Sequence, residues 1–272
     1  MTRSNEDDDW FVHAFGPRIE RLEACFTGHA YEPHRHDTYA IGLTLAGVQN
    51  FHYRGARVSS TPGHVMVIHP DERHDGYAGT PSGFRYQMIY VPPDMLQDIL
   101  GGQPLPFIAG GIVNDPRLAR CVGGLLRHVD ATHESFQEDD GLYDLAQALS
   151  HHGIRRRIKP SIDYRAAQRA KAYLDAATTD RITLADLEQA SERSRWQLSR
   201  DFRAFFGTSP YRYLTMRRLD RAKSQLGDGV AISDAALASG FADQSHLTRQ
   251  FKDAFGMSPG RWAALRSARK PN

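Results

Sequence analysis

The chain has 272 residues, which is enough for two domains. The formal net charge is only +2, but residues 1–150 carry 11 Lys/Arg and 20 Asp/Glu, a net charge of −9, whereas residues 151–272 carry 23 and 12, a net charge of +11. A basic half of this kind suits a polyanionic partner, and two cysteines with no apolar run near the roughly 20 residues of a membrane span exclude a disulfide scaffold and a transmembrane protein.

The first ten residues are acidic and polar and include the run Glu6-Asp7-Asp8-Asp9. They have neither the basic flank nor the apolar centre of a signal peptide. We therefore expect a cytoplasmic protein with no membrane partner.

Between residues 18 and 92 the hydrophobic pattern has a period of two. Large apolar residues occupy every second position from Tyr39 to Leu45 and from Phe84 to Tyr90, and glycine and proline interrupt the pattern at Gly55 and at 62–63. Short alternating strands separated by such turns indicate an antiparallel barrel or sandwich. We assign residues 1–112 to this domain.

Three histidines of this domain occupy positions that suit a shared site. His34 and His36 are separated by one residue, so both side chains point to the same face of a strand, and we place His74 on a facing strand. Three imidazoles could form a metal site. The segments around them resemble the two motifs of the cupin barrel, although cupin enzymes add a Glu after the second His, where this chain has residues 39–41, Tyr-Ala-Ile.

The alternative occupant of the barrel is an organic effector, because the interior of a barrel is a natural site for a small molecule. We expect such an effector pocket, with no bound metal and no cofactor. The residues assigned to it are His34, His36, Tyr39, Tyr53, His74 and Tyr90.

After Pro92-Pro93 the pattern changes to that of helices. Within residues 113–151, two apolar stripes recur at helical spacing, one from Leu118 to Val129 and one from Leu142 to Leu149. These helices pack either onto the barrel or against a second subunit. Residues 152–162, with the basic run 155–159, form the expected linker, which either contacts phosphates or is simply solvated.

The last third of the chain contains a repeat. Residues 198–210 are echoed by residues 247–259 at an offset of 49, and a repeat is one supersecondary unit used twice. Each copy consists of a short helix, a turn, a basic helix and a Gly-x-Ser-Pro break, which is a helix-turn-helix. We predict two units, at about 183–206 and 232–255, in an all-helical domain of residues 163–272.

Two such units can enter successive major grooves of double-stranded DNA if the helix between them, 211–226, holds the recognition helices about 34 Å apart. In the second unit Leu247, Phe251 and Phe255 share the buried side, which leaves other faces for the duplex. The outward residues that we assign to DNA binding are Arg195, Trp196, Ser199, Arg200 and Arg203 in the first unit and Gln244, Ser245, Arg249 and Lys252 in the second.

The turns of the two units differ in sequence. Gly240 can adopt positive φ in the second turn, and Asp243 is a good N-cap for the helix that follows. The first turn has Glu192-Arg193 instead. Because positive φ is uncommon for a residue other than glycine, we expect this turn to be reshaped or less stable.

These residues resemble the AraC/XylS family of bacterial transcription regulators over about 163–268, in the repeat length, the second turn and both Phe-Gly-x-Ser-Pro ends. The resemblance implies a sequence-specific transcriptional regulator with an effector-binding barrel. It implies a homodimer, which favours the subunit interface for the helices of 113–151, and contact with RNA polymerase if the protein is an activator. It places base or phosphate contacts at Trp196, Ser199, Arg200, Gln244, Ser245 and Arg249.

The expected fold class is therefore α+β multidomain, with a cupin-like antiparallel barrel, a helical appendage and an all-α double helix-turn-helix domain. We expect no enzymatic activity. One alternative is a metal-dependent cupin enzyme that carries a DNA-binding domain, and the missing Glu counts against it. The other is a protein that bends DNA without a ligand.

Overall fold

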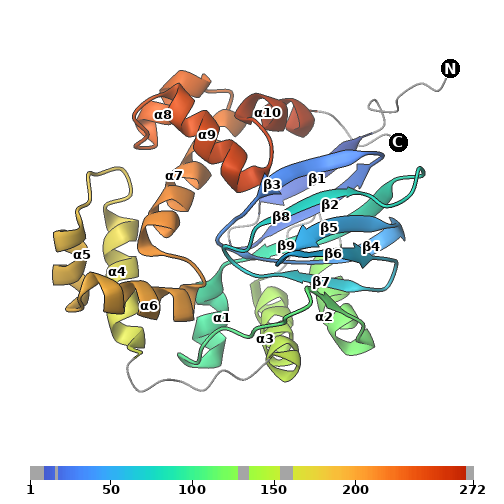
Figure 1. Ribbon diagram of the computed structural model, residues 1–272, viewed down its shortest axis with the longest axis horizontal. Helices are drawn as coiled ribbons and strands as arrows, with labels where there is room; N and C mark the ends of the chain where they lie inside the picture. Colours follow the sequence, from blue (N-terminus) through green and yellow to red (C-terminus); the bar gives the residue numbers. More distant parts are fainter. Residues whose placement is uncertain (1–8, 16–17, 128–134, 154–161, 268–272) are drawn as a thin grey trace.

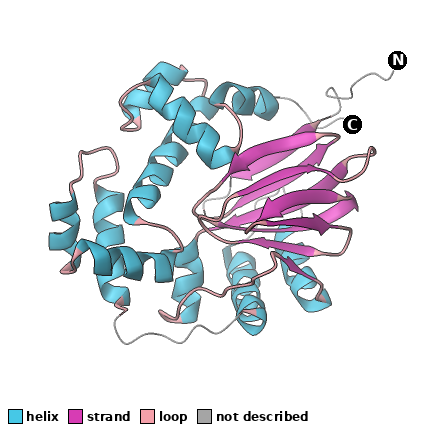
Figure 2. Cartoon of the chain, viewed as in Figure 1, coloured by secondary structure: helices cyan, strands magenta, loops and turns pink. Residues whose placement is uncertain are grey.

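The computed structural model describes residues 9–15, 18–127, 135–153 and 162–267. The strands gather in one half of the molecule, with helices beside and below them (Figures 1 and 2). The strands are β1 (Trp10–Phe15), β2 (Glu20–Phe26), β3 (His29–His34), β4 (Tyr39–Gly47), β5 (Gln49–Tyr53), β6 (Ala56–Ser60), β7 (Val65–Ile68), β8 (His74–Ala78), β9 (Phe84–Val91) and β10 (Ile112–Val113).

The helices are α1 (Pro93–Leu100), α2 (Pro116–Leu126), α3 (Ser135–His152), α4 (Tyr164–Ala176), α5 (Leu184–Ser191), α6 (Arg195–Phe206), α7 (Pro210–Gly227), α8 (Ile232–Ala238), α9 (Gln244–Phe255) and α10 (Pro259–Ser267). An antiparallel sheet domain followed by a helical domain confirms the expected α+β multidomain fold. None of the helices in the described part of the chain is long and apolar enough to cross a lipid bilayer.

The N-terminal domain consists of two antiparallel sheets. One has the strand order β1-β2-β9-β4-β7-β10 and the other β3-β8-β5-β6. Alternate residues of a strand in the larger sheet pack into two different cores, one on each face of the sheet. Along β4, Ala40 packs into the core between the sheets, whereas Tyr39 and Ile41 pack into a second core under the helices α1–α3. The larger sheet is thus covered on both faces, which is how layered domains bury their apolar surface.

Helices α2 and α3 cover the outer face of the larger sheet. Leu118 and Val122 of α2 and Leu145 and Leu149 of α3 are fully buried in the core that contains Ile41. The two stripes therefore form an intramolecular core and not the expected subunit interface, because the sheet presents its own apolar face directly beneath them.

The domain boundaries can be placed only in part. Strand β10 pairs with β7, so the barrel continues through Val113, one residue beyond the expected boundary. Residues 154–161, which contain most of the predicted linker and its basic run, lie outside the described residues, and so does Val129 of the first predicted stripe.

In the C-terminal domain, the predicted units correspond to α5–α6 and α8–α9, with α7 between them (Figure 1). Helices α6 and α9 both end at a glycine in the left-handed conformation, Gly207 at φ 72° and Gly256 at φ 67°. The next helices begin at Pro210 and Pro259. The repeated Gly-x-Ser-Pro break thus closes one helix with glycine and starts the next with proline at its first position.

The first turn is reshaped, as its sequence suggested. Glu192 occupies the left-handed region at φ 55°, where the second unit uses Gly240 at φ 83°. The left-handed residue precedes the N-cap Ser194 by two positions in the first unit and the N-cap Asp243 by three positions in the second. A hydrogen bond from outside the turn stabilises this conformation. The Arg169 guanidinium donates it to the carbonyl of Ser191, the residue before Glu192, at 2.6 Å.

Candidate functional site

The recognition face of α6 is exposed. Leu198, Phe202 and Phe206 are buried on the opposite side of this helix, so the remaining faces are directed to solvent. Trp196 is 74% exposed, and its ring lies 5.1 Å from the guanidinium of Arg195. Of the other predicted DNA contacts on this helix, Arg200 and Arg203 are exposed and Ser199 is half-buried.

The recognition face of α9 is exposed in the same way. Leu247 and Phe251 are fully buried, and Asp243 caps the helix by accepting a hydrogen bond from the backbone NH of His246. The four predicted DNA contacts on this helix are all exposed: Gln244, Ser245, Arg249 and Lys252. Exposed Arg, Lys and Gln side chains on one helix face are suited to phosphate and base contacts.

The surroundings of the two recognition faces differ. The groove beside Arg195 and Trp196 is lined only by residues of the C-terminal domain. The groove beside Arg249 and Lys252 is lined also by Glu32 and Arg73 of the barrel. DNA that docks on α9 therefore approaches the barrel as well.

Four arginines of the connecting helix α7 have structural partners. Arg212 binds Asp253 and the carbonyl of Arg35, and Arg217 binds Asp37 at 2.7 Å. Arg218 donates to backbone carbonyls at Thr178 and Asp180, and Arg221 to that of Ala238. Part of the positive charge of the C-terminal half is thus used inside the protein.

Ion pairs join the acidic barrel to the basic C-terminal domain. Lys171 pairs with Asp94 of α1 at 3.0 Å, and Lys223 of α7 pairs with Glu20 of β2 at 3.0 Å. The opposite net charges of the two halves therefore stabilise their contact in addition to suiting a polyanion. The sequence reasoning missed these residues, because the partners are more than 75 positions apart in the chain and no local pattern connects them.

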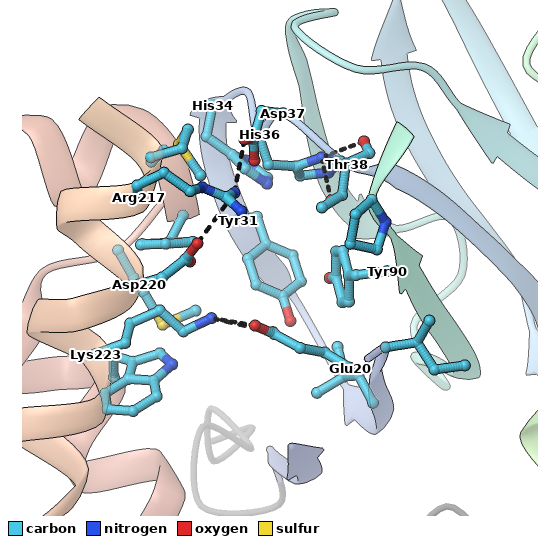
Figure 3. A pocket seen from close by; sticks show the side chains of 18 of the residues that line it. Glu20, Tyr31, His34, His36, Asp37, Thr38, Tyr90, Arg217, Asp220 and Lys223 are labelled. Carbon is cyan, nitrogen blue, oxygen red and sulfur yellow. Dashed lines mark hydrogen bonds and ion pairs between the residues drawn. The ribbon is translucent and has the colours of Figure 1, made fainter. Parts of the chain in front are cut away.

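A cavity of about 280 Å³ lies between the barrel and α7, α9 and α10. Its apolar wall has contributions from both domains, including Phe11 and Leu22 of the barrel and Met216 and Trp262 of the helical domain. Figure 3 shows its polar side, where Arg217 bridges Asp37 and Asp220 and where Lys223 reaches Glu20.

Burial perturbs the titration of the cavity walls. It raises the pKa of Asp37, an effect that Arg217 opposes, and it raises the pKa of Asp220 to about 6 against the lowering effect of Arg217 and Lys223. Burial also raises the pKa of Tyr31 to about 12. The Tyr31 phenol is therefore neutral at physiological pH and offers a ligand a hydroxyl group instead of a charge.

Only some of the residues assigned to the effector pocket line this cavity. His34, His36 and Tyr90 line the cavity. Tyr39 does not line it, because its side chain lies in the core under the helices and donates a hydrogen bond to the carbonyl of Pro106 at 2.7 Å. Tyr53 does not line it either, since its hydroxyl is bound to Nδ1 of the buried His69 at 2.5 Å.

The three predicted histidines come together at the edge of this cavity. His34 and His74 face each other in the register of β3 and β8, with their ring centroids 4.2 Å apart, and the rings of His36 and His74 are 4.9 Å apart. The ligand nitrogens of the three all lie within 4.8 Å of one another. This is the cluster of described residues that could hold a metal ion.

Two family models match the chain. Residues 16–146 match the AraC-like ligand binding domain, and residues 187–264 match a helix-turn-helix domain. Among similar proteins, the HTH-type transcriptional activator RhaS of Escherichia coli is 25% identical over 259 residues, with 90% of each chain covered. An uncharacterized HTH-type transcriptional regulator of Bacillus subtilis, YbfI, is 25% identical over 220 residues, which cover 79% of this chain and 80% of YbfI.

Solved structures of ToxT from Vibrio cholerae share the fold. One superposes with a TM-score of 0.67 at 12% identity and covers 92% of this chain and 100% of ToxT. Another, with an unsaturated fatty acid bound, superposes with a TM-score of 0.64 at 15% identity and covers 98% of each chain.

Proposed function

Because the chain belongs to the AraC family of transcriptional regulators, we propose that a small-molecule effector binds in the cavity between its ligand-binding and DNA-binding domains. One observation carries the proposal: both domains build the wall of this cavity. Helix α7, which supplies Met216, Arg217 and Lys223 to the wall, also connects the two helix-turn-helix units.

A ligand in this cavity contacts both domains only when they lie against each other as they do in this structure. Its affinity is therefore different for any other arrangement of the domains, and this difference allows the ligand to shift the equilibrium between the arrangements. The effector thereby changes the relative position of the two recognition helices and the affinity for DNA.

The walls suggest the chemical class of the effector. Aromatic and aliphatic side chains, among them Phe11, Met216 and Trp262, surround one part of the cavity, and the ion pairs of Lys223 and Arg217 lie in another. A molecule with an apolar body and a polar head fits this division. The fatty acid bound to ToxT, which shares the fold, has the same division.

The exposed residues of α6 and α9 assigned above contact double-stranded DNA in this proposal, Arg200 and Arg249 at the bases or phosphates of successive major grooves. Two chains form a homodimer, an activator also contacts RNA polymerase, and the protein acts in the cytoplasm without catalysis. The exposed side chains of Phe136 and Tyr143 on α3 remain available to a second subunit.

The DNA assignment is tested with the full chain and a duplex that the wild type selects from a random pool. Arg200→Ala and Arg249→Ala should each weaken binding by about 1–3 kcal/mol, roughly 5- to 150-fold, if each arginine reads a base. Arg120→Ala is the matched control, because it removes the same charge from an exposed position on α2. Unchanged affinity in both test variants refutes the assignment.

The cavity is tested by filling it. Oleate should raise the thermal midpoint of the wild type and change its DNA affinity, because its apolar chain and carboxylate match the walls. Met216→Trp should abolish both responses while DNA binding without oleate persists, since Met216 is buried at the cavity and away from the recognition faces. An equal response of this variant and the wild type places the effector elsewhere.

A further inference from the structure

Strands β3 and β8 bring the side chains of three histidines close together. His34 ends β3 and His74 begins β8, and the two are paired across these neighbouring antiparallel strands. His36 follows two residues after His34, and its ring lies 4.9 Å from that of His74 and 5.4 Å from that of Tyr90. The three side chains are buried, with exposed fractions of 7%, 5% and 6% in chain order.

Backbone carbonyls determine which nitrogen of each ring carries the proton. The Nδ1 atoms of His34, His36 and His74 lie 2.8, 2.9 and 2.9 Å from the carbonyl oxygens of Glu32, Thr38 and Glu72. A carbonyl can only accept, so Nδ1 donates in all three rings. In a neutral imidazole Nε2 then carries the lone pair, which is the arrangement that orients histidines as metal ligands.

A second observation points to an occupant. Nε2 of His36 is buried and has no hydrogen-bond partner among the described residues. A buried unsatisfied polar atom is costly, and a bound cation satisfies it.

The dimensions suit a first-row transition ion. A tetrahedral zinc ion with bonds of about 2.0–2.1 Å holds its nitrogens about 3.3 Å apart, and the nitrogens here lie within 4.8 Å of one another, so small side-chain rotations complete the site. Imidazole suits zinc, iron, nickel and copper, and not magnesium or calcium. Asp37 is not part of this cluster, and its Oδ2 is paired with Arg217.

We propose that His34, His36 and His74 bind one divalent first-row transition-metal ion through their Nε2 atoms, with the remaining coordination position open to the interdomain cavity. His34 and His36 both line that cavity, so a polar group of a ligand there can reach the ion. The metal site shares His34 and His36 with the wall of the cavity assigned to the effector, but metal binding does not require an effector.

The metal site is joined directly to the second helix-turn-helix unit. Residues that flank His34 make two backbone hydrogen bonds to the end of α9, from Glu32 NH to Gly256 O at 3.3 Å and from Arg35 NH to Asp253 O at 3.0 Å. An ion that fixes His34 therefore fixes the strand segment on which α9 rests. Occupancy of the site changes the freedom of the second recognition helix.

The test uses the full chain without a histidine tag, stripped of metal by a chelator. Titration with Co²⁺ should give the visible absorption of a low-symmetry four-coordinate ion at about one equivalent per chain, and Zn²⁺ should displace it. His36→Ala and His74→Ala should each weaken Co²⁺ binding by more than about 100-fold, because loss of a ligand exceeds the 10- to 100-fold cost of losing a ligand's hydrogen-bond partner.

His52→Ala is the matched control, since His52 lies on β5 of the same sheet but is 61% exposed and paired with Asp75. If the alanine variants do not fold by circular dichroism, His36→Gln, which keeps a polar side chain of similar size, replaces them. Wild-type affinity in the His36 and His74 variants, an equal loss in His52→Ala, or no one-equivalent endpoint overturns the metal site.

The link to α9 has its own measurement. The DNA affinity of the wild type should differ between the zinc-loaded and the stripped protein, and that of His36→Gln should not. Stoichiometric metal binding with equal DNA affinities in both states would overturn the link and leave the site. Because neither titration contains oleate, failure here is distinct from failure of the effector proposal.

Discussion

The two helix-turn-helix units have the same local structure and different neighbours. Helices α6 and α9 each run for 12 residues and end at a left-handed glycine. The core of the first unit, around Phe202, is a cluster of its own within the C-terminal domain. The core of the second, around Phe251, is continuous with the interior of the barrel, through residues such as Met216 and Leu22.

The ends of both helices rest on the N-terminal domain, but on different parts of it. Gly256 at the end of α9 rests on β3, where an added Cβ would lie 2.7 Å from the carbonyl of Glu32 and 2.9 Å from Nδ1 of His34. Gly207 at the end of α6 rests instead on the ring of Pro70. One sequence repeat thus supplies two similar recognition helices, but only α9 makes backbone hydrogen bonds to the segment around His34, at the end of β3.

Core truncation should produce the largest effects and separate the two units. Phe202→Ala and Phe251→Ala should each lower the free energy of unfolding by about 3–5 kcal/mol, because both rings are fully buried. Hydrogen exchange should increase in α4–α6 for the first variant, and in both α8–α10 and strands β1–β3 for the second. Equal hydrogen exchange of the barrel strands in both variants would contradict the conclusion that only the core of the second unit is continuous with the barrel.

Gly256→Ala should have the next largest effect. Alanine at this position has to adopt the positive φ of Gly256, which costs about 1–2 kcal/mol, and its Cβ also collides with Glu32 and His34. Gly229→Ala is the control, since its φ is +82° and nothing lies within 4 Å of the added atom. We expect a larger fall in thermal midpoint at 256 than at 229. Equal falls would show that the contact of α9 with β3 does not constrain the protein.

Glu192→Gly should act in the opposite direction. Glycine removes the strain of positive φ from the first turn, and the greater freedom of glycine in the unfolded chain offsets part of the gain, so we expect stabilisation of up to about 1 kcal/mol. Urea denaturation measures it. A loss of stability would mean that the 3.4 Å contact of Glu192 with Arg169 contributes more than the strain costs.

The smallest expected effect is the contribution of Asp220 to the pH dependence of stability. Its pKa is raised to about 6 in the folded protein, above the ordinary 3.8, so the folded state holds this proton more tightly than the unfolded state does. The contribution of Asp220 to stability is therefore greatest below pH 4, falls as pH rises to about 6, and is constant above. The side chain is 40% exposed, so solvent screening should reduce the change to well under about 1 kcal/mol.

Asp220→Asn removes this titration. The thermal midpoint of the variant, plotted from pH 4 to pH 7 relative to the wild type, should rise with pH because burial, and to a smaller extent the charges of Asp37 and Glu20, disfavour the ionised wild-type carboxylate. Arg217 and Lys223, which face the same carboxylate, limit the gain. A constant difference across this range would contradict the assignment of the raised pKa to Asp220.

The sequence by itself determined the elements whose signals are local. The 49-residue repeat, the N-cap Asp243 and the helix-ending glycines act within a few residues of their own positions, and each unit formed within about one residue of its predicted bounds. The sequence placed His34 and His36 together on one strand face, but β3 ends at His34 and His36 lies just beyond it. His74 joins them through the pairing of β3 with β8.

Only the tertiary structure decided which face of the sheet each large residue covers and what the arginines of α7 contact. Tyr39 has the alternation of a barrel residue but lies under the helices, since both faces of its sheet are buried. Arg217 belongs to a basic helix yet pairs with Asp37, 180 positions away in the chain. Contacts of this separation depend on how whole layers pack, and the cavity exists only where the two domains meet.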